Sequence, residues 1–427
     1  AAAADESGIN WGKVIVWADE VTRYHGHASV KGGAQGGNGG LVEVSGKQAL
    51  EFRGSVALDA PLGRAGTLLL DPLNITVQAG AGTLDGELTV PGDPTLAFGD
   101  ATGVTGTLNV TELTGFTSGT VELQADNDIT VNTAVTMQSG VSLKLAAINN
   151  VNVNANVTTS GGGNLRLEAD TDASGVGAVT LGSVTIDAPL IVGDLGKEYS
   201  GKLMIGSNVS FAQDAETFGL LTYSAGSLSV ASGKTLTLKG GMNWTGGVNI
   251  NGPGTISLPS GQTLAMSGAA SRGFINTTFN NAGTTTSNIG GSQLVLNNSS
   301  IFNNSGTFRF LGNGDNISVS VGTGTFNNTG TLEVSGAITN AVNNVAFTNT
   351  GGTLASGTGT LNLNSDGSHS GAISLTGTAV NFAASTHSFA DSTTIAGQLN
   401  LVGATANFGT VTTNGLVNFS NGAIHVT

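Results

Sequence analysis

The feature that most constrains the fold is a short phrase that returns four times in the second half of the chain. It reads FNNAGT at residues 279–284, FNNSGT at 302–307, FNNTGT at 326–331 and, more loosely, FTNTGGT at 347–353. Successive copies therefore follow one another with a period of roughly 20 to 24 residues, a spacing typical of a solenoid in which each repeat forms one coil. Equivalent residues of such coils stack on one another. The sequence therefore predicts a rod with long lateral surfaces and two ends.

The composition indicates that the coils are built from short β-strands. Gly accounts for 67 of the 427 residues, yet 39% of the chain is hydrophobic, which is too apolar for a disordered glycine-rich linker. Apolar and polar residues alternate over segments such as 165–169, 179–181 and 399–402, and Gly, Asn, Asp or Ser bound each segment. We therefore expect an all-β, right-handed parallel β-helix with about 20 to 24 residues per coil.

The repeated phrase also predicts which side chains stack. We expect the aromatic residues to form a ladder inside the narrow core, with the tandem amides forming hydrogen-bonded ladders along a turn. The predicted core ladder is Phe279, Phe302, Phe326 and Phe347, and the predicted amide ladders are Asn280, Asn281, Asn303, Asn304, Asn327 and Asn328.

The organisation along the chain is predicted as one continuous solenoid. Residues 1–77 and 107–270 are expected to form coils, and residues 271–427 the coils that carry the Phe-Asn-Asn repeats. Residues 78–106 lose the period and gather Gly, Asp, Pro91 and Pro94, so we interpret them as a loop or excursion.

Charge, cysteine content and hydropathy exclude several classes of protein. Residues 1–216 hold 24 of the 28 acidic and 10 of the 14 basic side chains, and no Lys or Arg follows Arg309. Such a surface argues against nucleic-acid binding, which depends on Lys and Arg neutralising phosphates. No apolar run approaches the ~20 residues that span a bilayer. Cysteine is absent, which fits export of an unfolded chain.

Three segments near the N-terminus closely resemble a known family. They read GKVIVWAD at 12–19, GGAQGGNGGLVEVSGK at 32–47 and GTLLLDPLNI at 66–75, with looser similarity in LQADNDITVN at 123–132. These segments resemble those of filamentous haemagglutinin-like exoproteins of bacterial two-partner secretion. The resemblance implies a right-handed β-helix that is exported through an outer-membrane secretion pore and has adhesive or surface-structural roles. The N-terminal secretion domain of that family is not recognisable here.

The histidines and the paired aspartates are the candidates for catalysis or metal binding. His25 and His27 flank Gly26, but no Asp-Asp pair accompanies them, so we interpret them as turn residues. The Asp126/Asp128 and Asp170/Asp172 pairs lack a complete calcium loop and are interpreted as acidic turns. The other histidines, His369, His387 and His425, lie apart in sequence and lack metal-ligand spacing. We therefore expect no catalytic residue, no metal site and no cofactor.

Together these observations predict a non-enzymatic protein that is secreted and extracellular or attached to the bacterial cell surface. It would be an adhesin shaft or a filament-forming subunit with a part in cell adhesion or biofilm. Its expected partners are further copies of itself and a host or cell-surface glycan or protein. The alternatives are a β-helical polysaccharide lyase or hydrolase and the stalk of a contact-dependent toxin.

Overall fold

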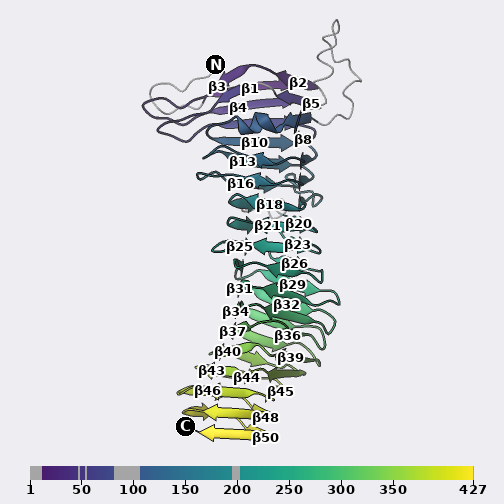
Figure 1. The fold of residues 1–427 in the computed structure, drawn as a ribbon, viewed down its shortest axis with the longest axis vertical. Coiled ribbons are helices and arrows are strands. Elements are labelled where there is room, and N and C mark those ends of the chain that lie inside the picture. Colours follow the sequence, from purple (N-terminus) through teal and green to yellow (C-terminus); the bar gives the residue numbers. More distant parts are fainter. Residues whose placement is uncertain (1–11, 47–48, 53–54, 81–105, 195–201, 427) are drawn as a thin grey trace. The chain divides into compact units, whose positions relative to one another are not determined.

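The computed structural model describes residues 12–46, 49–52, 55–80, 106–194 and 202–426. Contacts divide the chain into two compact units, Ala1–Gly219 and Leu220–Thr427, called here the N-terminal and the C-terminal unit. Within each unit, parallel strands stack in turns of about 22 residues, as the strand labels in Figure 1 show. The fold is a β-solenoid of about 16 turns, and the all-β prediction is confirmed. The described residues contain a single helix, the short α1 (Val110–Thr114).

Alternation of apolar and polar residues explains why these segments form strands. In β10 (Thr120–Ala125), Val121, Leu123 and Ala125 are buried, whereas the residues between them are half-buried. Successive side chains of a strand point to opposite faces, so a period of two directs one set inward. Because the same parity recurs in the paired strand β13 (Ser142–Ala147), apolar residues stack on apolar residues and form a continuous core.

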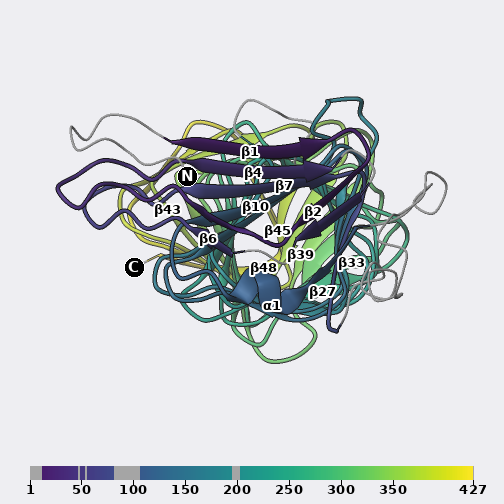
Figure 2. The same ribbon diagram turned by 90° about the horizontal axis from the view of Figure 1, so that it is seen from above.

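The N-terminal unit has three stacked sheets and two small side sheets. Figure 2 shows β1, β4, β7 and β10 running together along one side of this unit and α1 on the opposite side. The first sheet contains β1 (Lys13–Ala18), β4 (Leu41–Gly46), β7 (Thr67–Pro72), β10, β13, β16 (Leu165–Glu168), β19 (Leu190–Val192) and β22 (Ala215–Thr217). The second contains β9 (Gly106–Asn109), β8 (Ile75–Gln78), β11 (Ile129–Val131), β14 (Val151–Val153), β17 (Val179–Leu181) and β20 (Leu203–Ile205). The third contains β12 (Val135–Thr136), β15 (Val157–Thr158), β18 (Val184–Asp187) and β21 (Val209–Phe211). The side sheets pair β2 (Val21–Tyr24) with β5 (Ala49–Phe52) and β3 (His27–Ser29) with β6 (Ser55–Ala57).

The C-terminal unit also has three sheets. The one that carries the Phe-Asn-Asn repeats, called here the Phe face, contains β25 (Thr235–Leu238), β28 (Thr255–Leu258), β31 (Thr278–Asn281), β34 (Ser300–Asn304), β37 (Gly324–Asn328), β40 (Ala346–Thr350), β43 (Gly367–Ser370) and β46 (Thr386–Phe389). The second contains β23 (Leu221–Tyr223), β26 (Met242–Trp244), β29 (Thr263–Ser267), β32 (Thr284–Asn288), β35 (Thr307–Phe310), β38 (Thr331–Val334), β41 (Thr353–Ala355), β44 (Ala372–Thr376), β47 (Thr393–Ala396) and β49 (Val411–Thr413). The third contains β24 (Leu228–Val230), β27 (Asn249–Asn251), β30 (Arg272–Ile275), β33 (Gln293–Asn297), β36 (Asn316–Ser318), β39 (Thr339–Asn343), β42 (Thr360–Asn364) and β45 (Ala379–Ala383). The long strand β48 (Leu399–Phe408) pairs with both β45 and β46, and β50 (Val417–Val426) pairs with β48.

Coil length varies along the chain, as the sequence separation of stacked residues shows. His27 and Ser55, register partners on β3 and β6, have a separation of 28. In the C-terminal unit the separation is 24 between Asn304 and Asn328 but only 18 between Asn400 and Asn418. The mean turn of about 22 residues agrees with the predicted coil length, but the coils shorten towards the C-terminus.

Part of the predicted excursion cannot be compared with the structure. Of the stretch 78–106, residues 81–105 lie outside the described residues. The flanking strands β8 and β9 are neighbours in the second sheet, where Ile75 pairs with Gly106. The chain therefore resumes the same sheet after this stretch.

Candidate functional site

The predicted Phe ladder occupies one inward column of the Phe face. Phe279, Phe302, Phe326 and Phe347 are successive register partners on β31, β34, β37 and β40, and each is at most 2% exposed. Their neighbouring ring centroids lie 4.9, 4.9 and 5.9 Å apart. These separations are close to the strand spacing, so each ring stacks on the ring of the next coil.

The six predicted amides form two separate ladders because the two Asn residues of each pair point to opposite faces. The inner ladder is buried: Asn281 Nδ2 donates to Asn304 Oδ1 (2.6 Å), and Asn304 Nδ2 donates to Asn328 Oδ1 (2.7 Å). Asn328 continues it to Asn349, which the repeat pattern carries in its looser fourth copy. The inner ladder therefore supplies hydrogen bonds to amides that would otherwise be stranded in an apolar core.

The outer ladder lies on the half-buried surface of the same strands. Asn303 Nδ2 donates to Asn280 Oδ1 (2.8 Å), and Asn327 Nδ2 donates to Asn303 Oδ1 (2.9 Å). The Gly that follows each pair is required by close stacking of the turns, since a Cβ at Gly306 would collide with the carbonyl oxygen of Gly283 in the preceding coil. The Asn-Asn-x-Gly-Thr phrase therefore forms a strand end and turn that stack on the equivalent strand end and turn of the next coil.

Further amide ladders lie outside the repeats and were not predicted from the sequence. In the N-terminal unit, Asn127 Nδ2 donates to Asn74 Oδ1 (2.9 Å), and Asn154 Nδ2 donates to Asn132 Oδ1 (3.0 Å). In the C-terminal unit, Asn381 donates to Asn362 and Asn418 donates to Asn400, both at 2.9 Å. Only the three-dimensional register brings these Asn residues together, because no shared phrase surrounds them.

The Phe column is interrupted at Gly367, where two histidines meet. Gly367 is the register partner of Phe347, and His387 is the register partner of Gly367. His369 lies one inward position further along β43, in the column of the inner Asn ladder, as the partner of Asn349. His369 Nε2 and His387 Nδ1 are 3.2 Å apart, and both side chains are at most 1% exposed. His369 and His387 lie apart in sequence, and the fold brings them together in a pair that their linear spacing does not indicate.

The glycine makes room for the two rings. A Cβ at Gly367 would lie 2.6 Å from His369 Nε2 and 2.8 Å from His387 Nδ1. The rings occupy the volume that the next Phe of the column would fill, and Phe347, Phe382 and Phe389 pack against His369 with centroid separations of 6.0, 5.1 and 4.7 Å. The result is a polar pair enclosed by aromatic rings.

Burial disfavours the charged form of both histidines. Burial and, to a smaller extent, the neighbouring His387 ring lower the pKa of His369 to about 3. Burial likewise lowers the pKa of His387 to about 4, against the opposing effects of the Leu363 backbone and the Asp366 carboxylate. Both rings are therefore neutral at pH 7, and one nitrogen of the close pair donates to the other.

A buried cation closes a turn elsewhere in the C-terminal unit. The Arg272 guanidinium donates to the carbonyl oxygens of Ser267 (2.9 Å), Gly268 (3.0 Å) and Ala270 (3.1 Å) and to that of Trp244. Burial lowers the pKa of Arg272, and the Asp315 carboxylate acts in the opposite direction. The side chain is fully buried, so its role in this geometry is to hold backbone carbonyls.

Charged side chains of the N-terminal unit pair across the first sheet. Lys144 Nζ lies 2.7 Å from Glu122 and 3.5 Å from Glu168, and Arg166 contacts Glu168 and Asp194. Burial opposes the charge of Lys144, yet its hydrogen bond and attraction to these carboxylates raise its pKa. The carboxylates on this face are therefore engaged with neighbouring coils.

The acidic turns considered as calcium ligands are closed by hydrogen bonds. Asp170 Oδ1 accepts from Ser174 Oγ (2.9 Å) and from the Gly175 amide (3.1 Å). The Lys202 ammonium donates to the Gly175 carbonyl at 2.6 Å, which places a positive charge beside this loop. Asp128 Oδ1 accepts from the backbone and side chain of Asn150. Within the described residues, no group of three or more His, Cys, Asp or Glu side chains is arranged to hold a metal ion.

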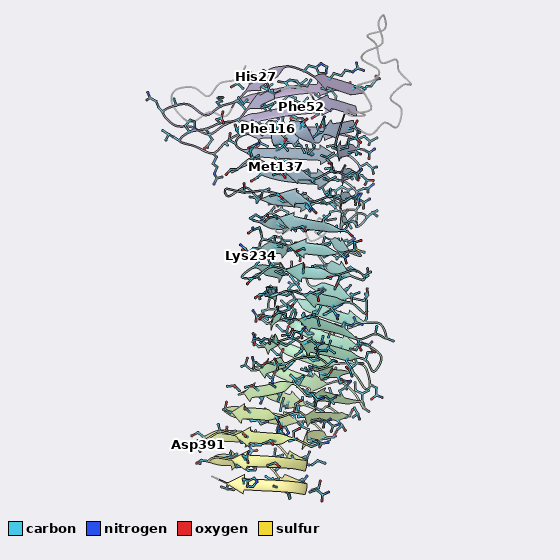
Figure 3. The ribbon with its side chains drawn as sticks, viewed as in Figure 1. His27, Phe52, Phe116, Met137, Lys234 and Asp391 are labelled. Carbon is cyan, nitrogen blue, oxygen red and sulfur yellow. The ribbon has the colours of Figure 1, made fainter. Side chains whose placement is uncertain are left out.

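The N-terminal histidines lie on the surface side of their unit. His27, labelled in Figure 3, is exposed, and its Nδ1 lies 2.8 Å from Ser55 Oγ across the small sheet of β3 and β6. His25 is also exposed. Of the tryptophans, Trp17 on β1 is 57% exposed, whereas Trp244 is buried.

A polar groove of about 510 Å³ follows the outer face of β40, β43 and β46. Thr348, Ser368, Ser388 and Asn407 line it as successive partners in one outward column, continuing the positions of the outer Asn ladder with smaller side chains. Asp391, at the turn between β46 and β47, adds a carboxylate (Figure 3). The groove offers hydroxyl and amide groups in a line, with the Asp391 carboxylate beside them and the apolar Phe389 and Ala390 also in its lining.

Comparisons with known proteins returned no relative: no protein-family model matches the chain, and no curated protein matches it. Among the described residues, no helix is long and apolar enough to cross a bilayer.

Proposed function

We propose that this protein is a non-enzymatic, extracellular structural or adhesive β-solenoid of a bacterium. It would serve as an adhesin shaft or filament-forming surface subunit of the filamentous haemagglutinin-like kind, secreted through a two-partner outer-membrane pore. The observation that carries the proposal is the use of polar side chains: amides, carboxylates and cations bond from coil to coil, as in the inner ladder Asn281–Asn304–Asn328 and the Lys144 ion pairs. Polar groups that bond neighbouring coils to one another stabilise the stack of coils, as a structural protein requires.

The polar groove supports an adhesive role. Its column of Thr348, Ser368, Ser388 and Asn407 presents hydroxyl and amide groups at strand spacing, beside the Asp391 carboxylate. Hydroxyl-rich ligands are recognised by such directional donors and acceptors, so a neutral cell-surface glycan is the proposed contact.

The last strand supports self-association. β50 carries Val417, Phe419, Ile424 and Val426 in columns that are inward-facing one coil earlier, and these side chains are 44%, 45%, 44% and 78% exposed. Among the described strands only β48 pairs with β50, so the other edge of β50 can accept the backbone hydrogen bonds of another strand. We propose that a second copy of the chain covers this edge. Pairing of two β50 strands closes a dimer, whereas pairing of β50 with β1 continues into a filament.

Negative-stain electron microscopy and light scattering of the purified native protein test this assembly. We expect end-to-end dimers or filaments, and we expect Phe419→Asp/Ile424→Lys to convert them to monomers. Val321→Lys, which changes a 60% exposed side chain in a turn of the same unit, is the matched control and should leave assembly intact. A monomer at all concentrations, or a native chain whose mass shows that it supplies the covering coil itself, would overturn the assembly proposal.

Glycan binding and the enzyme alternative can be examined together. Incubation with a panel of polysaccharides should give binding without new reducing ends or unsaturated products. Asp391→Asn combined with Asn407→Ala should weaken binding at least tenfold while β50-dependent assembly persists. Release of shortened saccharides would instead favour the polysaccharide lyase or hydrolase, and toxin activity delivered to contacted cells would favour the stalk of a contact-dependent toxin.

A further inference from the structure

We propose that the His369–His387 pair is an acid-sensitive break in the core of the C-terminal unit, at which the surrounding coils open when the pair is protonated. The pair stands where the continuous Phe column stops. Upstream of it, Phe279 to Phe347 fill the column coil by coil, and downstream of His387 the column continues with the small side chain of Ala406. The aromatic stack on which the coils depend is therefore replaced by a titratable contact at one level.

The geometry leaves room for only one proton between the two facing ring nitrogens. His369 Nε2 and His387 Nδ1 face each other at 3.2 Å, so one of them must act as the acceptor. If both rings were protonated, two donors and two positive charges would meet inside an aromatic cage that is closed to water. The space that Gly367 leaves beside the rings is already filled by them.

Few other charges face the pair. The strands packed around it, β40, β42, β43, β45, β46 and β48, carry no Asp, Glu, Lys or Arg. Two exposed carboxylates lie in the adjoining turns: Asp366 Oδ1 accepts from the Thr386 amide (2.8 Å), and Asp391 Oδ1 accepts from the Thr410 amide (2.7 Å). His425 lies on β50, in the outward column next to Asn407. Both carboxylates are exposed to water, and the attraction of Asp366 offsets only part of the effect of burial on the pKa of His387. Neither carboxylate contacts the rings as the counter-ion of a buried imidazolium.

The direction of the pH effect follows from linkage. Folding holds both rings neutral, with pKa values of about 3 and 4, whereas an opened coil lets them return to about 6.5. The opened state then binds more protons than the closed state between about pH 6.5 and pH 4. The closed state has its full stability above this window and loses it as the pH falls through it. Within this window, protonation of each ring increases the equilibrium constant for opening by up to about tenfold for each unit by which the pH falls.

Hydrogen exchange of the full chain at pH 7 and pH 5, corrected for intrinsic exchange rates, tests the proposal. We expect protection of amides in residues 345–408 to fall by at least tenfold at pH 5, while residues 279–334 change much less. The double variant His369→Asn/His387→Phe replaces each histidine by the residue type of its own column, Asn349 and Phe347. In this variant, residues 345–408 should lose no more protection between pH 7 and pH 5 than residues 279–334 do. Retention of the same loss in this variant would overturn the proposal.

Two controls separate the pair from neighbouring acidic groups. Asp366→Asn/Asp391→Asn and His425→Asn should both keep the acid response of the native chain. If the double histidine variant does not fold, nitrogen-15 NMR of labelled histidines in the native protein provides the decision. Rings that stay neutral in the folded state at pH 5 support the inference, whereas rings that titrate near pH 6.5 in the folded state contradict it.

Discussion

At the scale of single residues, identity at an inward position decides how neighbouring coils interact. Phe326 stacks on Phe302 at 4.9 Å with nearly parallel rings and meets Phe308 edge-on at 5.9 Å. Removing the ring would leave a cavity bounded by coils that are fixed by their own strand pairing. The local structure cannot collapse fully around such a hole, so the loss of packing is felt directly.

We therefore expect Phe326→Ala to lower the stability of the C-terminal unit by about 3 to 5 kcal/mol. Phe326→Asp should cost more, because it also buries an unpaired charge. Denaturant unfolding followed by the fluorescence of Trp244, which is buried in the same unit, provides the measurement. Phe419→Ala is the matched control, since Phe419 is 45% exposed on β50 and should change stability far less. Equal effects of the two alanine variants would show that the column is not the core.

At the scale of elements, the strand pair and its turn form the unit that repeats. The Asn-Asn phrase gives each coil one amide inside and one outside, and the two environments give the same residue type different energetic roles. Asn304 Nδ2 donates to Asn328 Oδ1 in the buried interior and to the half-buried Thr331 carbonyl. Asn303 makes its ladder bonds where water can replace them.

Asn304→Ala is expected to destabilise the C-terminal unit by about 2 to 4 kcal/mol, since it removes the buried donor to Asn328 Oδ1 and the buried acceptor of Asn281 Nδ2. Asn303→Ala removes the adjacent amide of the outer ladder and should cost less than about 1 kcal/mol. The two variants are compared by thermal unfolding at one protein concentration. If Asn303→Ala proved as costly as Asn304→Ala, the distinction between a buried and a solvated ladder would be wrong.

At the scale of the whole molecule, the charge asymmetry of the sequence corresponds to two ways of stacking coils. Ion pairs between coils, such as Lys144 with Glu122, are more numerous in the described part of the N-terminal unit, which also has amide bonds between coils. The C-terminal unit has an ion pair between Arg309 and Glu333 but joins its coils mainly through amides, hydroxyls and aromatic rings. The acidic turns at Asp128 and Asp170 are closed by amide and hydroxyl donors of the chain itself. Folding of these turns therefore has donors available without a divalent cation.

We accordingly expect thermal unfolding of the full chain to have the same midpoint with EDTA as with added calcium. A ligand that binds only the folded state raises the midpoint, by an amount that grows with the logarithm of its concentration once this exceeds Kd, so a bound cation would be visible as a difference between the two scans. Asp170→Asn should likewise leave the calcium response unchanged. A midpoint lower by several degrees in EDTA, and loss of that difference in Asp170→Asn, would identify the loop as a calcium site.

The fold class, the approximate coil length and the register of the repeated coils can be predicted from the amino-acid sequence alone. This was possible because the spacing of the repeated phrase is the spacing of the coils: the inner ladder from Asn281 through Asn304 and Asn328 to Asn349 advances by separations of 23, 24 and 21. The Phe that lies two positions before each inner Asn has the same spacing. Because side chains alternate between the two faces of a strand, this Phe and the second Asn of the pair both point inward.

The contacts beyond the repeats depend on the three-dimensional arrangement of the coils and could not be predicted from the sequence. There the separation of stacked residues falls to 20 between Thr350 and Ser370 and finally to 18 between Asn400 and Asn418, and no phrase marks the change. His369 and His387 lie in two different columns and meet in a volume that Gly367 leaves empty, so no linear spacing could pair them. The carbonyl cluster around Arg272 likewise depends on how a turn folds back on its neighbour, which a linear period does not encode.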